Sequence, residues 1–392
     1  MKYDFSQVIE RNDTLSIKYD FARERKKPND LLSLWVADMD FPVAQEIKEA
    51  LIERCNHGIF GYSEVKTPYY EVIAKWYRER FAWQTQEKWL VKTPGVVAAI
   101  ANAIRAFTEE GDSILIQKPV YYPFFLTIED NKRKVVNNSL VYKDGYYEID
   151  FVDFEEKIVS NNVKLFVLCS PHNPVGRVWK KEELLNIGDI CLKHNVIVVA
   201  DEIHADFVYP GYQHHVFANL KQEYQDITIT CTAPSKTFNI AGLQGSNIFI
   251  ANERLRKQFK QELKKTAHTD INIMGLVACQ AAYTYGDDWL EQVKFYIREN
   301  LEFVKNFLKV ELPQIKLIEP EGTYLIWLDF RKLNLTEDKL EDLIINKAKL
   351  WLDGGTMFGA EGLGFQRINI ACPRKILEQA MRQLAQAITT NI

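Results

Sequence analysis

The sequence has no long apolar run and only six cysteines. No stretch approaches the roughly 18 consecutive apolar residues of a membrane span, and the first twenty residues are too polar for a signal peptide. The cysteines form no CxxC pair and no zinc-type spacing, and most lie in apolar runs such as residues 166–169. These features predict a cytoplasmic protein without a membrane partner, whose cysteines are buried free thiols.

Concentrated charge and clusters of metal ligands are also missing from the sequence. The chain has 49 basic and 53 acidic residues, a net charge of −4, and no basic block longer than Arg25–Lys27. A nucleic-acid partner is therefore not expected, because it requires a basic patch. His214-His215 is the only adjacent histidine pair and has no carboxylate at ligand spacing. We expect a solvated loop or part of a substrate entrance there, and no metal site.

The chain does contain a large amount of apolar mass. Eight Trp, eighteen Tyr and twenty-two Phe are too many to leave solvated, which argues against disorder. A chain of 392 residues can bury a large core without disulfides or metals. Its length favours two or three domains.

Helical and strand patterns alternate from about residue 43 to about residue 250. Helices are predicted at 42–56, ending at Gly58, at 182–194, and from Thr67-Pro68 onward, with the threonine as N-cap. Short apolar runs that do not alternate with polar residues predict buried parallel strands. These runs are 113–117, 164–169, 196–200, 227–231 and 247–250.

The pattern changes after residue 250. Long helices are predicted at 253–285 and 288–310, followed by strands at 324–330 and 366–371 around a helix at 337–350. A last helix begins at Pro373. This order predicts a second, smaller α/β domain.

Three polar residues follow predicted strands, at the sheet edge where open α/β sheets bind ligands. Asn173 lies in a loop between two prolines, Asp201 ends an apolar strand, and Lys236 lies in Ala233–Asn239 just after another strand. A carboxylate at the end of a buried strand is costly unless it meets a cation. The alternatives are a surface lysine and, for Asp201, a helix N-cap.

In this order, Asn173-Pro174, Asp201 and Ser235-Lys236 resemble the fold-type-I pyridoxal-phosphate (PLP) enzymes of the aspartate aminotransferase superfamily. The resemblance covers the whole chain. It implies an α/β large domain with a mostly parallel seven-stranded sheet wrapped by helices, and a smaller α/β C-terminal domain. The implied boundaries are 1–45 for an N-terminal arm that packs with the small domain, 46–286 for the PLP-binding domain and 287–392 for the small domain.

The resemblance also implies roles around the cofactor ring. Lys236 would bond covalently to the cofactor aldehyde, and Asp201 would pair with the pyridine nitrogen, favouring its protonated form. Asn173 would donate to the ring oxygen and contact the substrate. Tyr121 would stack on the ring and belong to the catalytic set, with Tyr122 as the alternative if the register slips by one.

The cofactor phosphate needs backbone donors at a helix N-terminus. Thr93-Pro94-Gly95-Val96-Val97 opens a predicted helix and matches the family's phosphate cup through Gly95, Val96 and Val97, with Ser235 as a further ligand. Tyr62 resembles the tyrosine that reaches the phosphate from the neighbouring subunit. The implied active unit is therefore a homodimer.

Further segments resemble the MalY/PatB group of cystathionine β-lyases, or C–S lyases. They are Leu34–Phe41, Asp201–His204, Ser235–Leu243 and Ala371–Arg374. The chain departs from the aminotransferase pattern at two positions of the cofactor site. His204 stands where many aminotransferases have a tyrosine, and would bind the cofactor's ring oxygen. Gln244 stands in place of a phosphate-binding arginine, so the phosphate would depend more on backbone donors, Ser235 and Tyr62.

The implied substrate site contains Arg367, whose planar fork suits a carboxylate. Trp35, Asp38 and Tyr324 are candidates for the entrance wall, although core packing of the arm is an equal reading of Trp35 and Phe41. The expected reaction is α,β-elimination from L-cystathionine or related cysteine S-conjugates, giving a thiol, pyruvate and ammonia. An aminotransferase for aromatic or small amino acids is the alternative. A regulatory protein that binds a transcriptional activator is a third reading.

Overall fold

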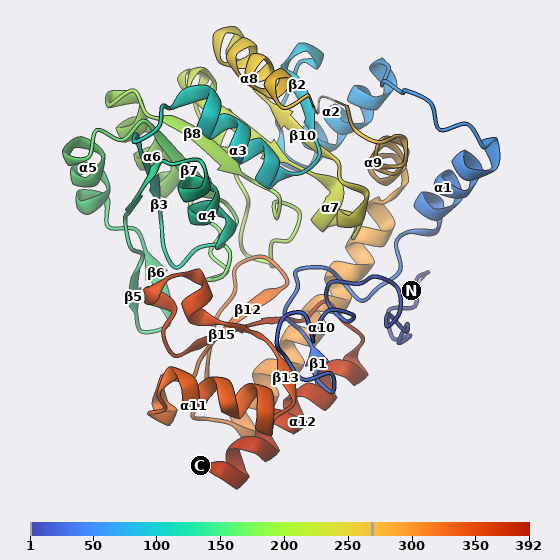
Figure 1. Ribbon diagram of the computed structural model, residues 1–392, viewed down its shortest axis with the longest axis vertical. Helices are drawn as coiled ribbons and strands as arrows, with labels where there is room; N and C mark the ends of the chain where they lie inside the picture. The colour runs from blue at the N-terminus through green and yellow to red at the C-terminus, as the bar shows by residue number, and fades with distance from the viewer. Residues whose placement is uncertain (1, 268–269) are drawn as a thin grey trace.

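The computed structural model describes residues 2–267 and 270–392. Its centre is a seven-stranded sheet in the order β2-β10-β9-β8-β7-β3-β4, in the upper part of Figure 1. The strands, in chain order, are β2 (Leu90–Thr93), β3 (Ser113–Ile116), β4 (Lys134–Asn137), β7 (Leu165–Cys169), β8 (Ile197–Asp201), β9 (Thr228–Thr232) and β10 (Ser246–Phe249). Five of these strands were predicted within one or two residues, whereas the runs at β2 and β4 were not recognised.

The direction of one predicted strand was wrong. β10 pairs antiparallel with both β9 and β2, while β3, β4, β7, β8 and β9 are parallel to one another. Between β9 and β10 the chain forms only the one-turn helix α7 (Pro234–Thr237) and a short 3-10 turn. A parallel crossover usually carries a full α-helix across a face of the sheet, and this connection has none, so the chain returns antiparallel. Because β10 is buried along its whole length, its apolar run resembles those of the parallel strands.

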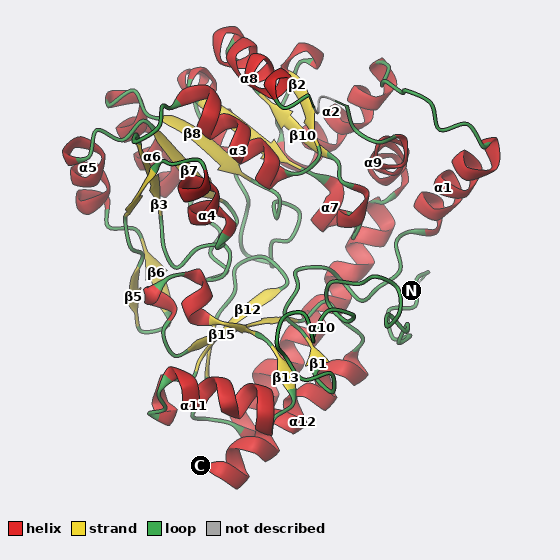
Figure 2. Cartoon of the chain, viewed as in Figure 1, coloured by secondary structure: helices red, strands yellow, loops and turns green. Residues whose placement is uncertain are grey.

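The two faces of the sheet belong to different parts of the core. Leu165 and Val167 of β7 pack in the cluster that contains α3 (Val96–Phe107) and α8 (Glu253–Lys265), whereas Phe166 and Leu168 pack in the cluster that contains α6 (Lys181–Lys193). Successive side chains of a strand point to opposite faces, so helices cover both sides (Figure 2). Smaller elements complete this part: α4 (Pro123–Asp130), α5 (Phe151–Ser160) and the hairpin β5 (Val141–Lys143) and β6 (Tyr146–Glu148).

Several helix boundaries differ from the predicted ones. α1 (Gln45–His57) ends at the left-handed Gly58 as expected, but α2 (Thr67–Phe81) has Lys66 at its N-cap position and no side-chain cap. The helix predicted at 253–285 is two helices, α8 and α9 (Ile273–Tyr285). The side chain of Asn272 accepts a hydrogen bond from Gly275 N at 2.8 Å, which begins a new helix.

The C-terminal part forms its own four-stranded sheet, in the order β11-β12-β15-β14 (lower part of Figure 1). It is joined by the pair β1–β13, through which the N-terminal arm attaches. The helix predicted at 337–350 ends early, because Leu350 is already in β13. These elements are β1 (Leu32–Ser33), β11 (Lys316–Ile318), β12 (Leu325–Asp329), β13 (Leu350–Trp351), β14 (Asp353–Gly354), β15 (Phe365–Asn369), α10 (Asp287–Glu311), α11 (Glu337–Asp342, continued by a π turn) and α12 (Arg374–Asn391). The predicted domain boundaries stay predictions.

Within residues 2–267 and 270–392, no helix is both long and apolar enough to cross a membrane. All six cysteines are free thiols. Five of them are buried as expected, but Cys55 is exposed. The reason is its place on α1, whose only buried residue is Ile47.

A buried arginine ties the large sheet region to the segment before β12. The side chain of Arg177 forms ion pairs with Glu183 and Glu321, each at 2.8 Å, and donates to the backbone oxygen of Tyr147. Its guanidinium also lies over the ring of Trp179, at 4.7 Å from the centroid. Because Arg177 and Glu321 are both buried, each charge depends on the other for compensation.

Replacing Arg177 with Met should therefore lower the free energy of unfolding by about 3–5 kcal/mol, because Glu321 is left buried without its cation. Urea unfolding followed by circular dichroism measures this change. The double variant Arg177→Met/Glu321→Gln should recover part of the loss. The matched control is Lys143→Met, which breaks the exposed pair with Glu148 and should cost no more than about 1 kcal/mol. Equal losses in both single variants would contradict the proposed role of the buried pair.

Candidate active site

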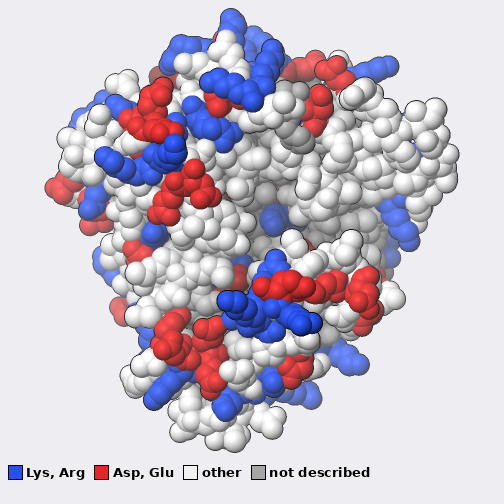
Figure 3. Space-filling model, viewed as in Figure 1, with Lys and Arg blue, Asp and Glu red and all other residues white. Residues whose placement is uncertain are grey.

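A cavity of about 240 Å³ lies where β7, β8 and β9 end, at the carboxyl edge of the large sheet. Many residues singled out from the sequence line it, among them Tyr121, Asn173, Asp201, His204 and Lys236. The space-filling view shows a hollow between the upper and lower parts of the molecule (Figure 3). The structure therefore gathers these side chains from separate strand ends into one site.

Lys236 lies in the short helix α7, directly after β9. Its Nζ donates a hydrogen bond to the backbone oxygen of Ala37 at 2.7 Å. Burial lowers the pKa of Lys236 to about 8, although the nearby carboxylate of Asp38 opposes this shift. Near neutral pH the amine is thus poised between its charged and neutral forms, as a nucleophile or general base requires. The alternative of a surface lysine is wrong.

Asp201 is the last residue of β8 and is buried. Burial raises the pKa of its carboxyl to about 7, and the backbone hydrogen bond from Ile203 at 3.1 Å only partly opposes this. Residues 203–206 form a turn, so Asp201 is not a helix N-cap. Among the described residues it has no ion pair, which leaves a buried carboxylate in need of a cationic partner.

His204 lies three residues further along and is also buried. Burial lowers its pKa to about 3, and the positive charges of Lys236 and Arg367 add to the effect, so the ring is neutral at pH 7. Its Nδ1 has no hydrogen-bond partner within the part of the chain that the structure describes. A buried, unpartnered ring nitrogen beside the cavity is available for a ligand atom.

Arg367 and Asn173 are in direct contact. The Nη1 of Arg367 donates to Asn173 Oδ1 at 3.0 Å, and its Nη2 donates to Trp35 O at 2.9 Å and forms an ion pair with Asp353. Its Nε is buried without a partner among the described residues. Sequence reasoning missed Asp353. Its place is fixed by the antiparallel register of β14 and β15, which sets it opposite Arg367, and no local pattern reveals that register.

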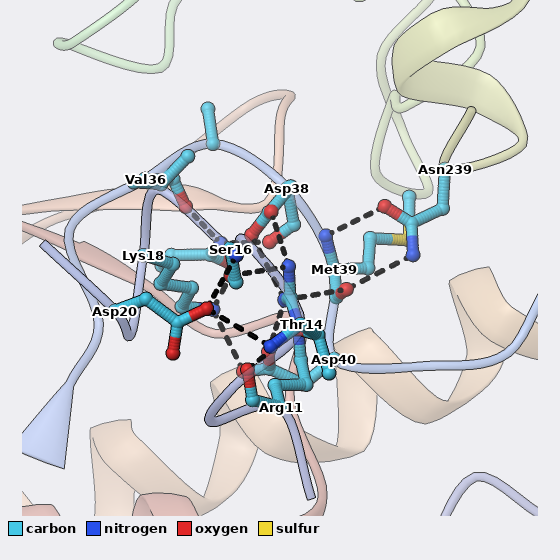
Figure 4. Close-up of polar contacts among 12 residues, drawn as sticks. Arg11, Thr14, Ser16, Lys18, Asp20, Val36, Asp38, Met39, Asp40 and Asn239 are labelled. Atoms are coloured by element: carbon cyan, nitrogen blue, oxygen red, sulfur yellow. Dashed lines mark hydrogen bonds and ion pairs between the residues drawn. The ribbon is translucent and has the colours of Figure 1, made fainter. Parts of the chain in front are cut away.

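The segment 35–41 crosses the site and is fixed by charged groups of the N-terminal arm (Figure 4). Arg11 forms ion pairs with Asp38 at 2.7 Å and with Asp40 at 2.6 Å, and Lys18 pairs with Asp40 at 2.7 Å. Asn239 binds the backbone of Met39 through both its amide nitrogen and its oxygen. Asp38 was a candidate for the entrance wall, whereas Arg11 and Lys18 were not recognised from the sequence, because their partners lie far away along the chain.

The residues predicted for the entrance wall differ in burial and in the partners that they contact. Tyr324 is buried and donates its hydroxyl to Ala37 O at 3.0 Å, so it shares that acceptor with Lys236. Phe41 belongs to the core, which agrees with the packing alternative. Trp35 is half-buried and stacks on Trp351, with ring centroids 4.6 Å apart.

One wall of the cavity can receive an anion. Gly95, Val96 and Val97 line it at the start of α3, where the first backbone N–H groups have no partner within the helix. Ser235 and Gln244 line the same cavity. This set matches the predicted phosphate cup in position.

The remaining predicted positions are the two candidate ring-stacking tyrosines, Tyr121 and Tyr122, and the exposed Tyr62. Tyr121 lines the cavity and Tyr122 does not, so the register with Tyr121 agrees with the geometry. Tyr62 is fully exposed in the loop between α1 and α2, outside the cavity of its own chain. That loop runs along the outer edge of the molecule in Figure 1.

The expected solvated loop at His214-His215 was wrong for the first histidine. His214 is buried, and its Nε2 lies 3.2 Å from Glu202 Oε2, while His215 is half-buried. Glu202 also accepts from Phe217 N, so both partners stabilise the chain after β8. In the described part of the chain, no group of three or more His, Cys, Asp or Glu residues could hold a metal ion.

Comparison with known proteins agrees with this geometry. Residues 29–384 match the family model described as aminotransferase class I and II. The chain belongs to this family. Cystathionine beta-lyase PatB of Bacillus subtilis (strain 168) is 42% identical over 386 residues, which cover 98% of this chain and 100% of that protein.

Solved structures give the same result. Cystalysin from Treponema denticola, which contains pyridoxal 5′-phosphate, matches with a TM-score of 0.96 at 41% identity, over 100% of both chains. The PLP-bound C–S lyase from Staphylococcus hominis, complexed with L-cycloserine, matches with a TM-score of 0.92 at 34% identity, again over 100% of both chains. The expected family and the fold-type-I architecture of this chain are thereby confirmed.

The pKa of Lys236 can be measured in protein freed of small molecules. Acetic anhydride reacts with neutral amines, so the labelling of Lys236, followed by peptide mass spectrometry, should reach half its maximum near pH 8. In Asp38→Asn the midpoint should move to lower pH, because the charge that favours the ammonium form is lost. The exposed Asp144→Asn variant should leave the midpoint in place. An unchanged midpoint in Asp38→Asn would refute the electrostatic link between the two residues.

Proposed function

We propose that the protein is a PLP-dependent carbon–sulfur β-lyase. It would convert L-cystathionine or related cysteine S-conjugates to a thiol, pyruvate and ammonia. The observation that carries the proposal is the cavity in which Lys236, Asp201 and Asn173 meet at three adjacent strand ends. Similarity to PatB and to the C–S lyase from Staphylococcus hominis supports the lyase over the aminotransferase reading.

The polar groups of the cavity fit this cofactor. Asp201 is buried and forms no ion pair among the described residues, and a protonated pyridine nitrogen supplies the missing partner. His204 has a free ring nitrogen for the ring oxygen, and Asn173 is the proposed donor to the same oxygen. The phosphate would bind the backbone of Gly95–Val97 together with Ser235, with Gln244 beside it.

The chain's own residues then have distinct tasks in the reaction. Bound PLP supplies an electron sink for negative charge at the substrate Cα. Lys236 takes the Cα proton on Nζ, which a pKa of about 8 allows. Arg367 holds the substrate carboxylate, for which its unpartnered Nε is one available donor. The Cβ–S bond breaks with both electrons going to sulfur, and the remaining aminoacrylate hydrolyses to pyruvate and ammonia.

Tyr121 would stack on the cofactor ring. Ala37 O and Asp38 would steady the protonated amine of Lys236 between steps, since one accepts its hydrogen bond and the other attracts its charge. Trp35 and Tyr324 are the proposed entrance wall. The activator-binding role remains a prediction from the resemblance.

The proposed active unit is a homodimer in which Tyr62 reaches the phosphate in the partner's cavity. The full exposure of Tyr62, beside the exposed Ile59 and Phe60, supports this arrangement. Such an apolar loop is costly to leave in water.

The lyase is tested with PLP-loaded protein and L-cystathionine, with no keto acid present. Pyruvate, followed with lactate dehydrogenase, and free thiol should form in equal amounts. Lys236→Ala should lower this turnover by at least about a thousandfold, because the base and covalent attachment point is lost. Borohydride reduction followed by peptide mass spectrometry should locate PLP on Lys236 in the unaltered protein only. Turnover that requires an added α-keto acid would instead establish the aminotransferase.

The role of Tyr62 is tested by Tyr62→Phe. Loss of one hydrogen bond to a charged phosphate should weaken PLP binding by about tenfold or more, with the dimer retained. Equilibrium ultrafiltration measures the affinity and sedimentation measures the assembly. Tyr212→Phe, at another exposed tyrosine, serves as the control. Equal PLP affinity in the two variants would count against contact between Tyr62 and the cofactor.

A further inference from the structure

Arg25 is an exposed cation on the N-terminal arm. Within the described residues no acidic side chain pairs with it, and its one side-chain hydrogen bond runs from Nη1 to the backbone oxygen of Phe21 at 3.3 Å. Its guanidinium lies 5.5 Å from the centre of the Trp35 ring. An aromatic neighbour leaves the charge of an arginine free to bind an anion.

Trp35 connects this arginine to Arg367, the proposed ligand of the substrate carboxylate. Its backbone oxygen accepts the hydrogen bond from Arg367, while its ring lies flat on Trp351. Arg25 and Arg367 therefore both contact Trp35, the first at its ring and the second at its backbone oxygen. The stacked tryptophans hold that residue in a fixed orientation.

Tyr122 supplies independent evidence that Arg25 is near the site. Its ring lies 5.4 Å from the ring of Tyr121, which lines the cavity. Burial raises the pKa of Tyr122, as does the charge of Asp353, whereas the charges of Arg367 and Arg25 oppose the rise. Both arginines thus lie close enough to act on the same phenol.

The other basic groups of the arm near this site are already neutralised. Arg11 and Lys18 pair with Asp38 and Asp40, and Lys27 pairs with Glu341. Basic and acidic side chains gather on the lower rim of the central hollow (Figure 3). Arg25 combines an unpaired charge with direct contact to Trp35.

We propose that Arg25 selects substrates that carry an anionic group at the far end of the sulfur substituent. This inference rests on the proposed C–S lyase function. Arg367 would hold the α-carboxylate inside the cavity, and Arg25 would bind the second carboxylate at the entrance. The substrate class is therefore the cysteine S-conjugates whose leaving thiol bears a carboxylate.

A matched pair of substrates isolates this contact in the PLP-loaded enzyme. S-(2-carboxyethyl)-L-cysteine and S-propyl-L-cysteine share the same two-carbon spacer on sulfur, which ends in a carboxylate in the first compound and in an uncharged methyl group in the second. In Arg25→Gln the ratio of their kcat/KM values should fall about fivefold in favour of the propyl compound, the size expected for one exposed ion pair. Arg25→Glu should shift the ratio further. The ratio of the unaltered enzyme should also fall as salt rises, because this charge is exposed.

Arg23→Gln is the matched control, since it removes an exposed charge from the same segment. Its substrate ratio should equal that of the unaltered enzyme. An unchanged ratio in both Arg25 variants, with both compounds still cleaved, would overturn the selection by Arg25 and leave the lyase intact. An equal shift in Arg23→Gln would also overturn it, because general surface charge would then explain the preference. If neither compound is cleaved by the unaltered enzyme, the proposed function itself fails.

Discussion

The backbone oxygen of Ala37 accepts hydrogen bonds from both Lys236 and Tyr324. The neighbouring oxygen of Trp35 accepts one from Arg367. Lys236 and Arg367, from distant parts of the chain, are thus both held by a single stretch of N-terminal backbone, whose Ala37 lines the cavity. Cations inside a protein are tolerated only when polar partners replace water. The position of segment 35–41 is therefore the constraint on which the site depends, and the ion pairs of Arg11 and Lys18 keep it in place.

Burial shifts the pKa values of three titratable residues that line the cavity. Asp201 ends β8 and His204 lies three residues further along, yet burial raises the pKa of the acid to about 7 and lowers that of the histidine to about 3. Both shifts disfavour the charged form. The same burial makes Lys236 a far weaker base than an exposed lysine. A cofactor that brings its own positive and negative groups completes such a site, because it supplies the missing partners.

Much of this architecture follows from local sequence. The runs at 165–169 and 197–200 are continuous and apolar because both faces of the sheet are covered, and polar residues at or directly after the strand ends mark the ligand edge. The run at 228–232 is equally buried, although it has a threonine at every second position. β2 and β4 were missed because each is short and contains a lysine. The direction of β10 depends on how the chain returns, which its own residues do not encode.

Some residues of the site were also predicted from the sequence, and others were not. Lys236, Asp201 and Asn173 were found because each lies beside a strand end in a recognisable order. Asp353 and Arg11 were not found, because their roles arise from pairing between segments far apart along the chain. A pairing of that kind is a property of the folded register and has no signature within either segment.

The parallel pairing of Leu32 with Leu350 has a consequence for biosynthesis. The arm leaves the ribosome among the first segments, but its partner strand is made near the end of the chain. At roughly 5–20 residues per second, the arm waits on the order of tens of seconds before its strand partner exists. The exposed Val8, Leu15 and Ile17 belong to that waiting segment. A nascent chain stalled before β13 would therefore hold the arm through contacts such as those of Asn239 with Met39, without the strand that pairs with Leu32 and Ser33.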